Sequence, residues 1–326
     1  MMSTGEIRSE FKIPSIEPFR RALVTGCGGV LGYALVQRLL ADGWHVTGTT
    51  RSGLSPFGLE PCQQFLMAAV ELTNRDSIES LLLSLRPDIV FHLAACNDNS
   101  VPETGPMTIM MTNIFGTMHL LEAVRTIVPH ALVVLTSSIE SAYAMGHNAA
   151  ITPYRCSKLT VELLAKCYHD SYGISCGVIQ LTSLYGPGDR SNRRLVPYCM
   201  RKIVNSESID ISSPLDTERD FLYAEDAADA LLLSLENADF LAGKLFSVSS
   251  GSKVRIGDLV GFLIRVADDN LDLEASLPTQ LGKNIGHPTL PKWSPKWTLE
   301  KGLIETWNWF KVSLADSSTK CNVDKP

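Results

Sequence analysis

The sequence predicts an α/β protein whose first part forms a doubly wound parallel sheet and whose C-terminal part forms a smaller α/β lobe. Two observations lead to this prediction. Short apolar runs alternate with segments of helical spacing between residues 21 and 181, and the apolar runs are continuous rather than interrupted by polar residues. Strands of this kind are buried on both faces, as in parallel sheets that helices cover.

The apolar runs and the helical segments define the elements in chain order. Strands are expected at residues 21–26, 44–49, 88–93, 131–136 and 175–181. Helices are expected at residues 30–41, 77–85, 113–124, 154–172, 226–235 and 256–266. Because crossovers between parallel strands are right-handed, the intervening helices cover both faces of the sheet.

The composition of the chain changes after Tyr185, where prolines, glycines and charged residues become more frequent and the expected strands become shorter. We therefore divide the 326 residues into an N-terminal extension (1–20), a first domain (21–185), a smaller lobe made mainly of 186–312, and a disordered tail (313–326). This length suits one large domain or two small ones.

The composition is that of an ordinary globular protein, with 45% hydrophobic and 20% charged residues. A net charge of −6 argues against a general nucleic-acid binder, which needs a basic face. No run of 18 apolar residues is present and the N-terminus lacks a signal-peptide core, so no membrane association is expected. The eight scattered cysteines contain no C-x-x-C pair, which predicts a reduced, cytoplasmic protein without a metal site.

A glycine cluster lies between the first expected strand and the first expected helix, with the sequence Gly26-Cys27-Gly28-Gly29-Val30-Leu31-Gly32. Glycines at 26, 29 and 32 permit a tight turn, a close approach of a pyrophosphate to backbone N–H groups, and close packing of the helix on the strand. The helix N-terminus adds unpaired N–H groups and partial positive charge. The cluster therefore favours dinucleotide binding over its alternative, a purely structural turn.

The residues after the second expected strand bear on which dinucleotide binds. NAD sites often place an acid there for the ribose 2′-hydroxyl, but the run here is Gly48-Thr49-Thr50-Arg51-Ser52. The Arg51 guanidinium can pair with a 2′-phosphate, which favours NADP over NAD as the cofactor. A solvated arginine at a strand end is the alternative explanation.

Three residues that can take part in proton transfer are expected to meet at the carboxyl edge of the sheet, where open α/β sheets bind ligands. Ser138 follows the strand at 131–136, and Tyr154 and Lys158 lie four residues apart on one helix face. An ammonium and a positively charged nicotinamide stabilise a phenolate and lower the pKa of the phenol from about 10. Tyr154 can then exchange a proton with a sugar hydroxyl or ketone that Ser138 holds. An amphipathic helix with a snorkelling lysine is the alternative.

Several ordered motifs together resemble the extended short-chain dehydrogenase/reductases, in the NAD-dependent epimerase/dehydratase family that acts on nucleotide sugars. The resemblance covers roughly residues 20–312. The motifs that carry it are TGCGGVLG (25–32), PDIVFHLAA (87–95), TNIFGTMHLLEAVR (112–125), LTSSIE (135–140), PYRCSKLTVE (153–162), LTSLYGPGD (181–189), RDFLYAEDAADAL (219–231) and WSPKWTLEKGLIETW (293–307).

The resemblance implies a Rossmann fold and a role for particular residues. The implied cofactor contacts are Gly26, Gly29, Val30, Leu31 and Gly32 at the pyrophosphate, Glu71 and Leu72 beside the adenine, Leu93, Ala94 and Ala95 along a ribose, and Arg51, Asn113, Tyr154 and Lys158. Ser138, Tyr154 and Lys158 match the catalytic set. Arg219 looks like the arginine that contacts the substrate diphosphate, and Ser183 and Arg194 are further candidates for substrate binding.

Glu140 lies two residues after Ser138, where related sugar dehydratases carry a glutamate that removes a proton next to the ketone. Those enzymes place an acid or hydroxyl residue between the two, to protonate the leaving hydroxyl. Here Ile139 stands in that position, and its side chain donates no proton. A 4,6-dehydratase that uses Glu140 is therefore an alternative rather than the main hypothesis.

The main hypothesis is an NAD(P)-dependent epimerase or 4-ketoreductase that transfers a hydride at C4 of a nucleotide-linked hexose, with Tyr154 as acid/base. The sequence is similar both to GDP-4-keto-6-deoxymannose reductases and to UDP-glucose 4-epimerases. An enzyme for a substrate without a diphosphate is disfavoured by Arg219, and a non-catalytic cofactor-binding member by the intact Ser138, Tyr154 and Lys158. The resemblance also implies a homodimer that pairs the helices at 107–126 and 154–172, with apolar Leu159, Leu163 and Leu164 on the second.

Overall fold

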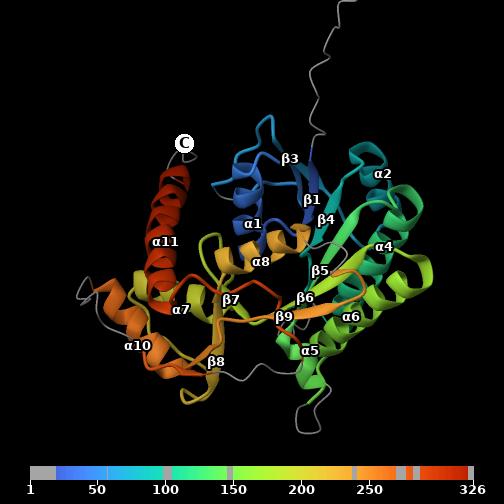
Figure 1. Ribbon diagram of the computed structural model, residues 1–326. Coiled ribbons are helices and arrows are strands. Elements are labelled where there is room, and N and C mark those ends of the chain that lie inside the picture. The colour runs from blue at the N-terminus through green and yellow to red at the C-terminus, as the bar shows by residue number, and fades with distance from the viewer. Residues whose placement is uncertain are drawn as a thin grey trace, which may run out of the picture.

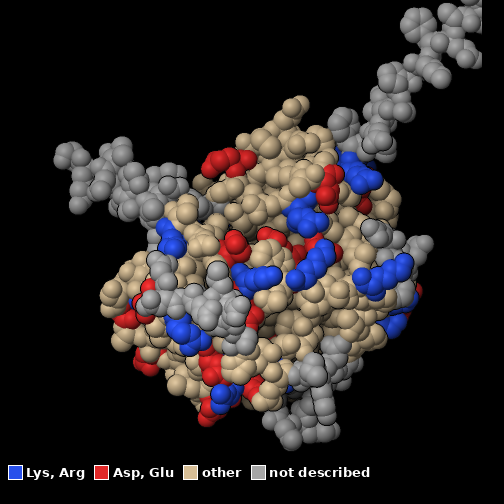
Figure 2. Space-filling model, turned by 60° about the vertical axis from the view of Figure 1, so that its left-hand side comes forward, with Lys and Arg blue, Asp and Glu red and all other residues tan. Residues whose placement is uncertain are grey.

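The computed structural model describes residues 20–56, 58–97, 105–144, 150–236, 241–268, 277–281 and 287–321 (Figure 1). The predicted N-terminal extension lies almost wholly outside these residues. Among the described residues, no helix combines the length and the apolar composition needed to span a lipid bilayer. The face drawn in Figure 2 carries basic and acidic side chains interspersed, rather than the basic stripe typical of nucleic-acid-binding proteins.

A seven-stranded parallel sheet forms the centre of the larger layer, with the strand order β3-β2-β1-β4-β5-β6-β9. Its strands are β1 (Arg21–Thr25), β2 (His45–Thr50), β3 (Phe65–Ala69), β4 (Ile89–His92), β5 (Leu132–Ser138), β6 (Cys176–Leu181) and β9 (Leu245–Val248). Every residue of β4 and β6 is buried, which explains why these strands are mostly apolar, with His92 and Gln180 as their buried polar residues. The predicted doubly wound fold is confirmed.

Helices cover both faces of this sheet (Figure 1). On one face, α1 (Val30–Ala41) packs against α8 (Ala224–Glu236), and their side chains share one buried core with the sheet. On the other face, α2 (Arg75–Leu85), α4 (Gly116–Ile127) and α6 (Pro153–Tyr172) bury a second core. Short helices precede α4 and α6, namely α3 (Pro106–Met110), the π-helix η2 (Met111–Phe115) and α5 (Ile139–Ala144).

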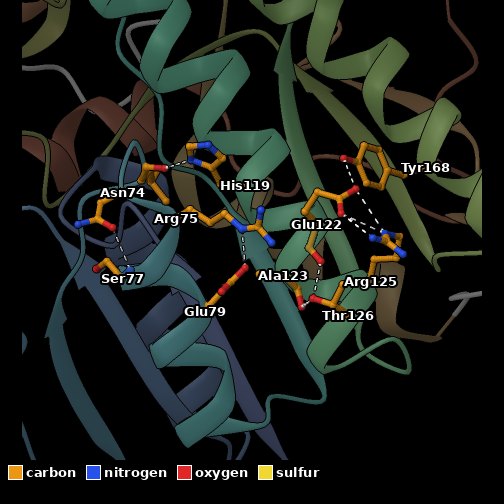
Figure 3. A network of polar contacts seen from close by, with 11 residues as sticks. Asn74, Arg75, Ser77, Glu79, His119, Glu122, Ala123, Arg125, Thr126 and Tyr168 are labelled. Carbon is orange, nitrogen blue, oxygen red and sulfur yellow. Dashed lines mark hydrogen bonds and ion pairs between the residues drawn. The ribbon is translucent and has the colours of Figure 1, made fainter.

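Polar contacts fasten α4 to α6 on the outer side of the second core (Figure 3). Arg125 donates two hydrogen bonds to the Glu122 carboxylate, at 2.8 and 3.1 Å to Oε2, and the Tyr168 hydroxyl donates to Oε1 at 2.8 Å. The hydrogen bonds from Arg125 are the main reason that the pKa of Glu122 is lowered. On the neighbouring α2, Arg75 pairs with Glu79 at 2.6 Å. These contacts fix the spacing of the helices that the sequence predicts to form a dimer interface.

A second lobe surrounds a four-stranded sheet of the order β11-β10-β8-β7. Its elements are β7 (Ser183–Tyr185), α7 (Leu195–Val204), β8 (Glu218–Tyr223), β10 (Ser252–Arg255), α10 (Ile256–Ala267), β11 (Gln280–Leu281) and α11 (Leu299–Cys321). Figure 1 shows α7, α10 and α11 gathered on the side opposite to α2, α4 and α6. A third buried core holds this lobe together.

The lobe differs from its predicted extent in two respects. The range 186–312 includes α8 and β9, which belong to the seven-stranded layer, because the chain crosses back to add its last parallel strand beside β6. The predicted disordered tail begins at residue 313, but α11 continues through Cys321. No proline or glycine interrupts the chain between Leu303 and Cys321, and Ser313 is still buried against the lobe.

Candidate active site

A cavity of about 930 Å³ opens at the carboxyl edge of the seven-stranded sheet. The segments that follow β1 and β4 line it side by side, at the point where the strand order reverses. Crevices at such switch points are where open α/β sheets bind ligands. Sixteen predicted site residues line this cavity, namely Gly26, Gly29, Val30, Leu31, Arg51, Glu71, Leu72, Leu93, Ala94, Ala95, Ser138, Tyr154, Lys158, Ser183, Arg194 and Arg219.

The glycine turn brings bare backbone to the wall of the cavity. Gly26 has φ +71°, and a Cβ on it would lie 2.7 Å from the backbone nitrogen of Ala94. Only glycine combines this conformation with this close approach. Gly29 precedes α1, and no side chain caps that helix, so the N–H groups of its first turn remain available to a ligand. This arrangement fits the pyrophosphate of a dinucleotide.

Gly32 takes the packing role that the glycine spacing predicts, and not the place at the cavity wall that the resemblance implies. It does not line the cavity, and a Cβ on it would lie 2.5 Å from the Cα of Cys27. Its role is to let α1 pack on the turn, because any side chain would push the helix away from residues 26 and 27.

Ser138, Tyr154 and Lys158 come together as predicted. Ser138 ends β5, and α6 begins at Pro153, where the Thr152 hydroxyl caps the helix by accepting from the Arg155 N–H. The Ser138 and Tyr154 side chains are hydrogen-bonded, and the Lys158 ammonium lies 6.0 Å from the centre of the Tyr154 ring. Lys158 Nζ also donates to the carbonyl oxygen of Thr136 at 3.0 Å, which fixes its position beneath the phenol.

Burial is the main cause of the pKa shifts of Tyr154 and Lys158. It raises the pKa of Tyr154 to about 12, with the hydrogen bond from Ser138 opposing the shift. It lowers the pKa of Lys158 to about 8, because the charged form loses its hydration. In the protein by itself, burial therefore raises the pKa of the phenol. The lowering expected from the ammonium together with a bound nicotinamide stays a prediction for the enzyme with its cofactor.

Asn113, which the resemblance implies as a cofactor contact, makes structural hydrogen bonds in this protein. It is 1% exposed on the π-helix and does not line the cavity. Its side chain accepts from the Cys96 N–H at 2.7 Å and donates to the Cys96 carbonyl at 2.8 Å and to Ser157 Oγ at 2.9 Å. Asn113 therefore ties the segment after β4, which lines the cavity, to α6.

Glu140 does not line the cavity either. Its Oε2 lies 2.6 Å from Arg155 Nε, and the two side chains form an ion pair between α5 and the start of α6. The Glu140 carboxylate is thus occupied by Arg155, although its negative charge still acts on the phenol of Tyr154 and helps to raise the pKa of that group. A dehydratase base at Glu140 would first have to leave its ion pair with Arg155.

The opposite end of the cavity is basic. Arg219, Arg193 and Arg194 line it together with Ser183. Arg194 donates to the buried Asp189 at 2.9 Å, and this ion pair holds the guanidinium in place. Burial raises the pKa of Asp189, and the charge of Arg194 opposes that shift. Arginines in this arrangement suit an anionic group such as a diphosphate.

Sequence reasoning missed a further group of lining residues. Most of them follow the carboxyl ends of β2, β4, β5 and β6, which is the signal that could have found them, namely Thr49, Thr50, Cys96, Asn97, Thr136, Ser137, Thr182 and Leu184. Thr108, Thr112 and Val196 come from helices, and no short motif marks them.

The model of the NAD dependent epimerase/dehydratase family matches residues 22–249. The chain belongs to this family. Among its relatives, a UDP-glucuronate 4-epimerase of Thermodesulfobacterium geofontis is 24% identical, with 90% of this chain and 96% of that protein covered. A UDP-glucose 4-epimerase of Mycolicibacterium smegmatis is 27% identical, with 89% and 98% covered. The solved structure of the Bordetella bronchiseptica enzyme WbmF in complex with NADH shares the fold, with a TM-score of 0.77, 23% identity, and 92% and 94% of the two chains covered.

Proposed function

We propose that the protein is an NAD(P)-dependent enzyme that acts at C4 of a nucleotide-linked hexose, as a 4-epimerase or a 4-ketoreductase. The observation that carries the proposal is the meeting of Ser138, Tyr154 and Lys158 in one cavity with the glycine turn. The two relatives described above are 4-epimerases by name, which supports chemistry at C4. When bound, the nicotinamide ring supplies the hydride acceptor or donor.

Tyr154 transfers the proton in this proposal. Burial keeps its phenol protonated, so it begins as a donor to a ketone oxygen, and the reverse reaction needs it as the phenolate. The Lys158 ammonium, 6.0 Å from the ring centre, stabilises that phenolate. Ser138 donates or accepts a hydrogen bond at the same substrate oxygen, since its hydroxyl already meets Tyr154.

The basic end of the cavity binds the diphosphate of the substrate. Arg219 and Arg194 present guanidinium groups there, and Asp189 orients the second of them. Ser183 also lines the cavity and is a candidate contact for the sugar. A substrate without an anionic group would leave these arginines without their ligand.

The alternatives have less support. A 4,6-dehydratase needs a free carboxylate at Glu140, which is paired with Arg155 instead. A non-catalytic family member has no need for the contact between the Ser138 hydroxyl and the phenol of Tyr154 above a buried ammonium.

NADP is the proposed cofactor, with NAD as the other candidate. Arg51 lines the cavity just after β2, and the segment from Thr49 to Ser52 contains no acid for a 2′-hydroxyl. A guanidinium there suits a 2′-phosphate. NAD is the other candidate because WbmF, which has the same fold, was solved in complex with NADH.

A homodimer through α4 and α6 is also part of the proposal. Large apolar side chains stand exposed on this side of the molecule, with Leu163 at 63%, Tyr172 at 55% and Phe115 at 44%. Apolar side chains that gather on one face of a soluble protein indicate a partner surface. The identical helices of a second copy would cover them.

The test combines a panel of nucleotide sugars with NAD⁺ and NADPH, followed by absorbance of the reduced cofactor and by NMR of the sugar. An epimerase converts sugar without net cofactor consumption, whereas a ketoreductase consumes NADPH. Tyr154→Phe should lower turnover by roughly 10²–10⁴-fold while NADPH binding persists. Tyr172→Phe, at an exposed tyrosine of the same helix, is the matched control and should keep full turnover. Full activity of Tyr154→Phe would refute the catalytic assignment.

A further inference from the structure

A buried polar cluster lies directly behind the catalytic residues. Glu162 follows Lys158 by one turn of α6, so that Tyr154, Lys158 and Glu162 share a helix face. Glu162 Oε1 accepts hydrogen bonds from Ser137 Oγ at 2.6 Å and from Ser141 Oγ at 2.5 Å. Ser137 on β5 and Ser141 on α5 lie on either side of Ser138. The Glu162 carboxylate therefore holds the segment that carries the Ser138 hydroxyl.

The cluster extends across the sheet. Gln180 on β6 donates to Ser141 Oγ at 2.9 Å and to Glu162 Oε1 at 3.4 Å, and its own Oε1 accepts from Ser247 Oγ of β9 at 2.8 Å. Gln180 and Ser247 are each at most 3% exposed. In the described part of the chain, the hydrogen-bond donors to Glu162 are neutral side chains, and no ion pair joins its carboxylate to a basic group.

Lys158 is the basic group one turn before Glu162 on the same face of α6. Its side chain is buried, with Nζ donating to the Thr136 carbonyl, and burial lowers its pKa to about 8 while the charge of Glu162 opposes the shift. The other titratable groups that face Lys158 are Tyr154 on α6 and His92 on β4. Burial and the Lys158 charge keep His92 neutral, with a pKa of about 3, so it does not compete for the role of counter-ion.

We propose that Glu162 is a positioning residue for the catalytic pair, whose carboxylate keeps the Lys158 ammonium protonated and holds the Ser137–Ser141 segment against α6. The inference rests on the proposed function of Tyr154 and Lys158. It goes beyond that function because Glu162 lies outside the cavity and does not touch a ligand there. Its effect reaches the reaction through Lys158, since a neutral lysine stabilises no phenolate.

The experiment measures the protonation of Lys158 without substrate. Trace labelling by acetic anhydride modifies only the neutral amine, so the pH dependence of Lys158 labelling, read by peptide mass spectrometry, gives its midpoint. We expect Glu162→Gln to lower this midpoint by about one pH unit, since a nearby opposite charge favours the ammonium. The alkaline limb of the turnover profile should move toward lower pH by the same amount.

Two further variants separate charge from structure. Ser141→Ala keeps the carboxylate and removes one hydrogen bond, so the labelling midpoint should stay unchanged; this variant also serves if Glu162→Gln does not fold. Glu162→Asp keeps the negative charge, so its labelling midpoint should stay close to that of the native protein. Glu122→Gln, a carboxylate of α4 that bonds Tyr168 and Arg125 far from Lys158, is the matched control and should leave the midpoint unmoved.

An unchanged midpoint in a folded Glu162→Gln protein would overturn the proposal, as would an equal shift in Glu122→Gln or a full shift in Ser141→Ala. The labelling needs no turnover. A failure of the proposed function, seen as the lack of conversion of every nucleotide sugar, is therefore distinguishable from a failure of this inference.

Discussion

The Glu140 carboxylate is held by Arg155, with 2.6 Å between Glu140 Oε2 and Arg155 Nε. Arg155 also donates through Nη1 to the Ala150 carbonyl at 2.7 Å, so its guanidinium is anchored on both sides. Arg155 stands next to Tyr154 in the sequence, yet it points away from the cavity, because adjacent residues of a helix face different directions. The pair joins α5 to the start of α6 and occupies the Glu140 carboxylate.

Glu140→Gln should therefore change turnover by no more than about fivefold, since a partly exposed ion pair contributes only about 1 kcal/mol. The rate of sugar conversion, measured beside the Tyr154→Phe variant, checks this expectation. A loss as large as that of Tyr154→Phe would show that Glu140 acts as a base and would restore the dehydratase alternative.

Much of the larger layer could be predicted because its signals are local. The helix at Val30–Ala41 was expected at these bounds, and the buried strands are mostly apolar segments of the sequence. The edge strand β3 was not predicted, because Phe65–Ala69 is only partly buried and has no clear period. Ser138, Tyr154 and Lys158 could be predicted for the same reason, because Ser138 ends one strand and the other two residues share one helix face.

Other features depend on contacts between distant segments, which spacing does not encode. The return of β9 to the large sheet is a pairing with β6 across 67 residues, as the Ser247–Gln180 hydrogen bond illustrates. The contacts of Asn113 and Glu140 could not be predicted for the same reason. Each has a motif position that suggests the cavity, but Cys96 and Arg155 are the groups that they meet.

Gly26→Ala should destabilise the fold and abolish cofactor binding. The residue has φ +71°, and its Cβ would lie 2.7 Å from the Ala94 backbone, so strain and a clash add to each other at about 1–3 kcal/mol or more. Gly43→Ala is the matched control, because Gly43 has φ +77° with nothing within 4 Å of the added Cβ. Urea unfolding and NADPH fluorescence titration measure the two effects. Equal destabilisation with intact binding in both variants would contradict the role of close approach at Gly26.

His92 should make the protein less stable as the pH falls from about 6.5 toward about 3. Its Nδ1 accepts from Thr25 Oγ1 at 2.8 Å and its Nε2 donates to Thr117 Oγ1 at 3.0 Å, because the Thr117 hydroxyl already donates to the Asn113 carbonyl. Burial lowers the pKa of His92 to about 3. Below pH 6.5, His92 is therefore protonated in the unfolded chain but stays neutral in the folded protein. The contribution is present above pH 6.5 and is lost by up to about 1.4 kcal/mol for each pH unit below it.

His92→Gln removes this titration. We expect the variant to be less stable at pH 7, where hydrogen bonds are altered, but to show a smaller decrease in the free energy of unfolding between pH 7 and pH 5. Urea titrations at both values measure the difference, with His119→Gln on α4 as the control. Parallel decreases in the native protein and in His92→Gln would disprove the assignment.

Arg51→Ala should weaken NADPH binding by roughly 10–100-fold and leave NADH binding nearly unchanged, because a charge-assisted hydrogen bond to a phosphate contributes about 1.5–3 kcal/mol. Arg51 lines the cavity but lies away from Tyr154, at the end of β2. Fluorescence titration of both reduced cofactors gives the two Kd values. If the native protein binds NADH more tightly than NADPH, the cofactor is NAD and Arg51 is a solvated side chain.

Leu163→Glu should convert a dimer into monomers. Leu163 is 63% exposed on α6, on the side where α4 and α6 are fastened together by Glu122 and Tyr168 (Figure 3), and a carboxylate there would be buried against the second copy. Light scattering during size-exclusion chromatography measures the mass of each species. Leu54→Glu is the matched control, since Leu54 is 73% exposed in the loop after β2 and far from these helices, so it should keep the native mass. A native protein that elutes as a monomer, or a dimer that survives Leu163→Glu, would place the interface elsewhere or remove it.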